Sequence, residues 1–76
     1  MVKLPIEFDL DRTPPLTCSV GEDGGFTLVR TNGDVEAVGA IGVVAGRYRV
    51  TDVAIGVDDP LIFQIESILN GAARNP

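Results

Sequence analysis

Three carboxylates, Glu7, Asp9 and Asp11, alternate along the first part of the chain and form its most regular group of reactive side chains. On an extended strand they would share one face at intervals of about 6.6–6.8 Å. Such a row could contribute to a cation site, or imitate the charges of a nucleic-acid backbone. It is also typical of a solvated strand face that prevents aggregation. We favour this last interpretation, because calcium needs about six to eight oxygen ligands.

Nucleophilic and cofactor chemistry have little basis in the sequence. The chain has no histidine and a single cysteine, Cys18, which therefore lacks the usual base that would activate it. We expect Cys18 to pack in the core, or at its edge, as a small hydrophobe. The glycines of segments 21–25 and 39–46 lack the spacing of phosphate-binding loops. No catalytic, cofactor-binding or metal-binding residue is predicted, and catalysis is not expected.

Two further features suggest surface contacts. The segment Arg47-Tyr48-Arg49 is the one basic and aromatic cluster, and we expect its arginines to pair with acids such as Asp34 or Glu36. Phe63 lies on the polar side of a predicted helix. It could mark an interface with another chain, be covered by a loop of its own chain, or be simply exposed. The possible interaction surface therefore comprises Phe63, Glu7, Asp9 and Asp11.

Length and charge narrow the class of protein. A chain of 76 residues with one cysteine makes a single domain that no internal disulfide can stabilise, which favours association with another chain. The net charge of −5 argues against nucleic-acid binding, which needs clustered basic residues. The N-terminal segment has no apolar stretch of signal or membrane-spanning length. Together with the free thiol, this leads us to expect a cytoplasmic protein.

The apolar pattern predicts five strands within residues 2–56. Residues 2–10 alternate cleanly, and Pro5 suggests either an edge strand or pairing that begins only after the proline. Residues 38–46 carry no polar side chain, which is typical of a strand buried on both faces. The second, third and fifth strands are predicted at residues 16–20, 26–31 and 47–56, and the fourth starts near Asp34 and includes segment 38–46. The spacing within 50–57 also suits a helix, but its β-branched residues favour a strand with a bulge near Thr51-Asp52.

Turns and the helix have their own local patterns. Asn32-Gly33 predicts a hairpin with a type I′ turn, and Ala45-Gly46 a second tight turn. A C-terminal amphipathic helix is predicted at about residues 60–73, with Asp59 as its N-cap and Pro60 at its first position. Asn70-Gly71 could end it early. The residues expected to face the core are Leu61, Ile65, Ile68, Leu69 and Ala72.

We therefore expect an α+β fold, with a small antiparallel sheet or partly open barrel of about five strands and one C-terminal helix. The function we favour is a small acidic cytoplasmic interaction protein that acts as a homodimer without catalysis. One alternative is a small-ligand binder or minor enzyme, with a pocket between helix and sheet near Gly39–Gly46. Another is an acidic mimic of nucleic acid that binds a basic protein partner.

Overall fold

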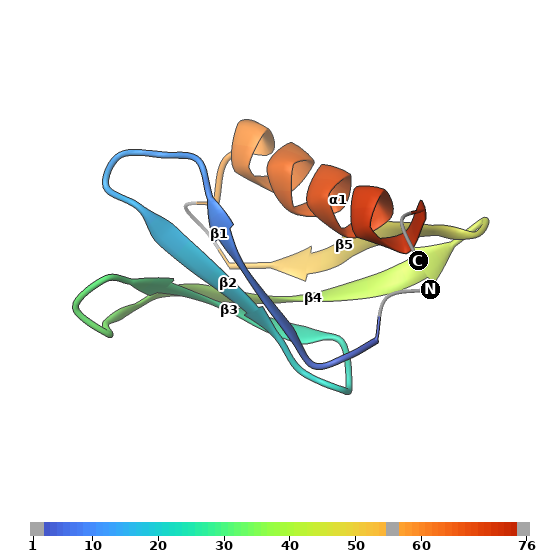
Figure 1. The fold of residues 1–76 in the computed structure, drawn as a ribbon, viewed down its shortest axis with the longest axis horizontal. Helices are drawn as coiled ribbons and strands as arrows, with labels where there is room; N and C mark the ends of the chain where they lie inside the picture. The colour runs from blue at the N-terminus through green and yellow to red at the C-terminus, as the bar shows by residue number, and fades with distance from the viewer. Residues whose placement is uncertain (1–2, 55–56, 75–76) are drawn as a thin grey trace.

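The computed structural model describes residues 3–54 and 57–74, and shows an antiparallel sheet with one helix. The sheet order follows the chain, so each strand pairs with the next one. The elements are β1 (Ile6–Leu10), β2 (Leu16–Val20), β3 (Gly25–Arg30), β4 (Val35–Val44), β5 (Arg47–Val53) and α1 (Asp59–Arg74). The sheet curves, and α1 lies across its inner face (Figure 1). The predicted α+β fold with five antiparallel strands and a C-terminal helix is confirmed.

The core fills the space between the inner face of the sheet and α1. All five strands and the helix contribute buried side chains, in the order Leu10, Leu16, Cys18, Val20, Phe26, Leu28, Ile41, Tyr48, Leu61, Ile65 and Leu69. The ring of Phe26 lies over Gly39, where a Cβ atom would come within 2.5 Å of it. Gly39 therefore serves core packing, because any side chain there would displace Phe26, the largest fully buried side chain of the core.

Polar side chains of α1 bind the backbone of β5 and of the residue that follows β1. The Asn70 amide accepts a hydrogen bond from the Tyr48 N–H at 2.8 Å and donates one to the Tyr48 carbonyl at 3.1 Å. Glu66 accepts from the Val50 N–H at 2.9 Å. The Gln64 side-chain amide likewise accepts a hydrogen bond from the Asp11 N–H at 2.9 Å and donates one to the Asp11 carbonyl at 3.0 Å. The helix thus supplies hydrogen-bond partners where β5 has no neighbouring strand.

The two predicted tight turns exist, but the type of the turn at Asn32-Gly33 differs from expectation. At Asn32-Gly33 only the glycine has positive φ, at 93°. The Gly33 N–H bonds the Arg30 carbonyl, and the Arg30 N–H bonds the Asp34 carbonyl, which fits a type I turn followed by a glycine bulge. The predicted type I′ turn is wrong here because the Asn32 side chain accepts from the Asp34 N–H and favours this longer loop.

Ala45-Gly46 is the turn with type I′ geometry. Both residues have positive φ, 52° and 79°, and the flanking Val44 and Arg47 are paired in the ladder. A type I′ turn matches the right-handed twist of the strands that it joins. The hairpin therefore tolerates Ala45 at positive φ, although this conformation is unfavourable for a residue with a Cβ atom.

The strand boundaries show one shortened and one bulged strand. The first strand begins at Ile6, after Pro5, and is an edge strand as predicted. In β5 the register shifts so that Thr51 has no partner on β4, which confirms the predicted bulge and excludes a helix over 50–53. Tyr48, Val50 and Val53 consequently all pack towards the core. Val2 and Ile55, which we predicted to lie in strands, fall outside the described residues.

The helix begins and ends one residue beyond the predicted range. Asp58 is the N-cap, since its side chain accepts from the Leu61 N–H at 3.0 Å and its carbonyl from the Ile62 N–H at 3.1 Å. Asp59 is already helical, so its prediction as the N-cap is wrong, and Gly71 does not end the helix. The predicted stripe is confirmed by the burial of Leu61, Ile65 and Leu69.

One prediction about β4 fails. Its segment 38–46 was expected to be buried on both faces, yet Val38 and Val44 are 54% and 55% exposed. Among the described residues there is a single helix, and it covers the inner face of the sheet. Within residues 3–54 and 57–74 the outer face therefore has no second layer.

We expect Asn70→Ala to lower the free energy of unfolding by about 1–3 kcal/mol, although alanine is the better helix former. The reason is that Tyr48 would lose both backbone partners at a partly buried site. Denaturant unfolding would measure the change, with Ser67→Ala on the exposed side of the same helix as the control. Equal stability of the two variants would contradict the role of Asn70.

A second prediction concerns the turn at residues 45 and 46. Ala45→Gly should stabilise the protein by on the order of 1 kcal/mol, because glycine adopts positive φ without a steric penalty. The matched control is Ala40→Gly in the middle of β4, which should destabilise by about 0.5–1 kcal/mol. Thermal unfolding curves that move in the same direction for both variants would contradict the assigned conformation.

Candidate functional site

The three N-terminal carboxylates are exposed, but they do not form one cluster. Glu7 and Asp9 alternate with the inward-facing Ile6 and Phe8, so they stand on the outer face of β1. Asp9 accepts a hydrogen bond from the Thr17 hydroxyl at 3.0 Å. Asp11 follows the end of the strand, where Gln64 holds its backbone. Across residues 3–54 and 57–74, no three His, Cys, Asp or Glu residues come together as a metal site would require.

Cys18 is fully buried, as the sequence led us to expect. Burial raises the pKa of its thiol to about 12, because the low-polarity core disfavours the charged thiolate. The thiolate is the form of cysteine that attacks substrates and binds metals. Cys18 therefore acts as a core residue at neutral pH.

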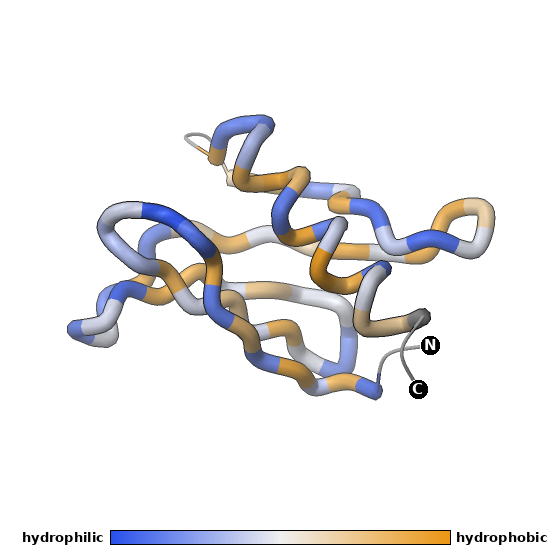
Figure 2. The backbone as a smooth tube through the Cα atoms, turned by 45° about the horizontal axis from the view of Figure 1, so that its top comes forward, coloured by the Kyte–Doolittle hydropathy of each residue, from blue (hydrophilic) through white to orange (hydrophobic). Residues whose placement is uncertain are grey.

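The outer face of the sheet carries an apolar stripe along β4. Residues paired across an antiparallel ladder share a face. Val35 is paired with Val29, Val38 with Thr27, and Val44 with Arg47, all on the side opposite the buried Leu28 and Tyr48. We call Val35, Val38, Ala40 and Val44 the β4 stripe. In Figure 2 most of β4 is drawn in orange or pale colours, with little blue along its length.

Charged side chains flank the β4 stripe on both sides. Glu7 and Asp9 lie on β1, at one edge of the sheet, and Arg47 and Arg49 lie on β5, at the other edge. Arg49 approaches Glu66 of the helix to 4.0 Å but remains 60% exposed. The outer face is therefore acidic on β1, apolar along β4 and basic on β5, whose two arginines also border the groove with α1.

The arginine partners predicted from the sequence are wrong. Glu36 binds Arg30 instead of Arg47 or Arg49, and this contact lowers the pKa of Glu36 and raises that of Arg30. Asp34 accepts from the Asn32 side chain. The reason is geometric: Arg30, Asp34 and Glu36 belong to the hairpin between β3 and β4, and the Ala45-Gly46 turn lies at the opposite end of β4.

Phe63 is the most exposed large hydrophobic side chain of the described chain, at 69%. It borders a shallow groove of about 250 Å³ between α1 and β5, together with Arg47, Arg49, Ser67 and Asn70. The alternative in which a loop of the same chain covers Phe63 is wrong for the described residues. Its role as an interface residue remains a prediction.

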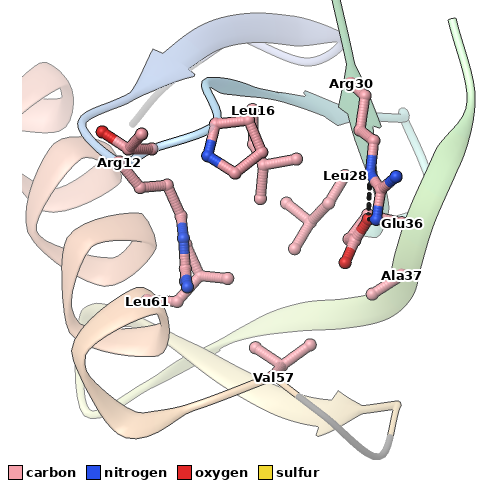
Figure 3. Close-up of a pocket in the computed structure, with 10 residues that line it drawn as sticks. Arg12, Leu16, Leu28, Arg30, Glu36, Ala37, Val57 and Leu61 are labelled. Atoms are coloured by element: carbon pink, nitrogen blue, oxygen red, sulfur yellow. Dashed lines mark hydrogen bonds and ion pairs between the residues drawn. The ribbon is translucent and has the colours of Figure 1, made fainter.

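A pocket of about 170 Å³ opens where the helix begins, between the sheet and α1. Leu16, Leu28, Ala37, Val57 and Leu61 line its apolar part (Figure 3). Arg12 and the Arg30–Glu36 pair stand on opposite sides of it in the same view. We expected a pocket between helix and sheet near Gly39–Gly46. The Phe26 ring fills the inner side of Gly39, and the hollow that Gly39 borders is lined by residues 38–40 and 52–54, without the helix. Sequence reasoning missed the residues that line the actual pocket.

Comparison with known proteins adds no relationship. The chain matches no protein-family model, and no curated protein or solved structure is significantly similar to it. Within the described residues, α1 is too short and too polar to cross a membrane.

Cys18 should be protected from thiol reagents while the protein is folded. We expect its reaction with an aromatic disulfide reagent to be at least ~1,000-fold slower in buffer than in denaturant, because reaction requires global opening.

The raised pKa of Cys18 also predicts that the stability of the protein depends on pH. Above about pH 8.5 the unfolded thiol ionises while the folded thiol does not, so unfolding becomes easier as the pH rises. Cys18→Ala should lack this part of the alkaline destabilisation, and equal pH profiles would contradict it.

Proposed function

We propose that this protein is a non-catalytic interaction module that associates as a homodimer through the outer face of its sheet. The observation that carries the proposal is the β4 stripe. Segment 38–46 has the composition of a strand buried on both sides, and its valines are about half exposed in the single chain. A second layer over the outer face would bury the apolar side chains of the β4 stripe, which the single chain leaves exposed.

The charges on either side of the stripe favour a second copy as that layer. When two such sheets stack face to face about a two-fold axis, one axis orientation places the β1 edge of each copy over the β5 edge of the other. Glu7 and Asp9 would then face Arg47 and Arg49 twice, by symmetry, and the β4 stripe of each copy would lie over β2 of the other. A partner of other composition would have to reproduce this arrangement of acid, apolar and basic zones.

The available area is sufficient for a weak dimer. At about 3.4 Å per residue, the ten residues of β4 span on the order of 34 Å, and three neighbouring strands are roughly 14 Å wide. The footprint is then on the order of 480 Å² per copy, or nearly 1,000 Å² for the pair, at the small end of specific interfaces. We therefore expect an association that depends on protein concentration in the micromolar range or above.

The dimer is tested by light scattering and sedimentation across protein concentrations. Val38→Glu should give a monomer at concentrations where the wild type is dimeric, because a carboxylate of each copy would be buried between the two sheets. Val43→Glu is a matched control, since Val43 lies on the same strand, is 48% exposed and shares the inner face with Tyr48. Phe63→Glu distinguishes the helix groove from the sheet as the interface. A wild type that stays monomeric at all concentrations contradicts the proposal.

A charge exchange tests the orientation of the two copies. Asp9→Arg and Arg47→Asp should each weaken the dimer by about tenfold or less, as expected for charges at the rim of an interface. Combining them in one chain should restore association, because each exchanged pair is again of opposite sign. Additive weakening in the double variant would exclude the two-fold arrangement described above.

The cytoplasmic location and the absence of nucleic-acid binding remain predictions from composition. The nucleic-acid mimic receives little support from the geometry, because only Glu7 and Asp9 share a face and Asp11 lies beyond the strand.

A further inference from the structure

The pocket at the start of α1 has features that the dimer proposal does not use. Its floor is apolar and is formed by Leu16, Leu28 and Leu61, which are 5%, 0% and 3% exposed. Polar side chains, those of Arg12, Thr13, Arg30 and Glu36, complete the lining. Its side walls come from different elements, with Ala37 on β4 and Val57 ahead of the helix (Figure 3). The outer face of the sheet, where we place the second copy, lies on the other side of these strands.

The size of the pocket limits the ligand to one ring or its equivalent. An apolar cavity of about 150 Å³ accepts benzene, and this pocket measures about 170 Å³. A longer chain or a second ring would have to extend out of the opening. The body of a ligand that fits is therefore a single six-membered ring or a branched alkyl group of the same size.

The two arginines at the opening are not equally available. Arg30 engages Glu36 through both Nε and one terminal nitrogen, so its charge is already compensated. Arg12 reaches Asp58 only at 3.4 and 3.5 Å, at the outer limit of a hydrogen bond. Asp58 has a second and shorter contact, the 3.0 Å hydrogen bond from the Leu61 N–H. Asp58 therefore stays bound at the helix start even when Arg12 turns to another anion.

We propose that this pocket binds a small carboxylic acid whose apolar body is about the size of one ring. The body occupies the space lined by Leu28, Ala37 and Leu61, and the carboxylate pairs with the Arg12 guanidinium at the opening. Carboxylate and guanidinium form two parallel hydrogen bonds when their planes align, which makes Arg12 the residue that selects an anion. The apolar floor selects against acids without a hydrophobic body.

Benzoate is the probe of choice, with benzyl alcohol as its neutral counterpart and acetate as an acid without a ring. Binding to the full chain is followed by calorimetry and by chemical shifts of residues around the pocket. For a ligand of this size we expect a dissociation constant on the order of 1 mM for benzoate, with weaker binding of both other probes. Arg12→Gln should weaken benzoate about tenfold and leave benzyl alcohol unchanged, since it removes only the charge.

Two more variants complete the experiment. Ala37→Leu fills the pocket and should abolish binding of benzoate and benzyl alcohol, and its folding is checked by circular dichroism. Lys3→Gln removes an exposed positive charge that does not line the pocket, and should bind benzoate like the wild type. If Ala37→Leu does not fold, Arg12→Gln still tests the proposal, because an exposed ion pair contributes only about 0–1 kcal/mol to stability. Absence of saturable benzoate binding, or equal weakening by Arg12→Gln and Lys3→Gln, would overturn the proposal.

Discussion

The hydrogen bonds between α1 and the backbone beside it are the interaction on which this structure depends. A curved sheet of five strands in open order has two edges, and each edge strand has backbone groups without a neighbouring strand. Asn70 and Glu66 serve those of β5, and Gln64 serves Asp11 beyond β1. One helix thus connects the two edges of the five-stranded sheet. This arrangement stabilises the curvature that encloses the core.

The same arrangement explains why the two faces of the sheet differ. The helix and the inner face share a compact apolar core with no buried charged side chain among the described residues. No described segment covers the outer face, although β4 has the apolar composition that suits a covered strand. A small protein gains the missing burial most directly by association, and the acidic and basic edges provide a way to orient two copies.

The proposed ligand pocket follows from a different feature, the place where helix and sheet separate. The helix side chains bind β5 closely through Asn70 and Glu66, whereas its first turn rests on Leu61 and the N-cap Asp58. The space left beside Leu28 and Ala37 is apolar below and charged at the opening. The dimer surface and the pocket are on opposite sides of the sheet, so each of the two proposals can fail without the other.

The number and type of the secondary-structure elements could be predicted from the sequence alone. The predictions that succeeded rest on residues close together in the chain: the period-two alternation of the strands, the glycine-containing turns at residues 32–33 and 45–46, the phase change at Thr51, and the apolar stripe of α1. The burial of Cys18 and the exposure of Glu7, Asp9 and Phe63 were likewise predictable. The turn type at Asn32-Gly33 and the N-cap were not, because each depended on one side-chain hydrogen bond to the backbone. The partners of the arginines, the amide contacts of Gln64 and Asn70, and the position of the pocket were decided only by tertiary structure. They join residues up to 53 positions apart, and no local pattern contains the curvature that brings those residues together.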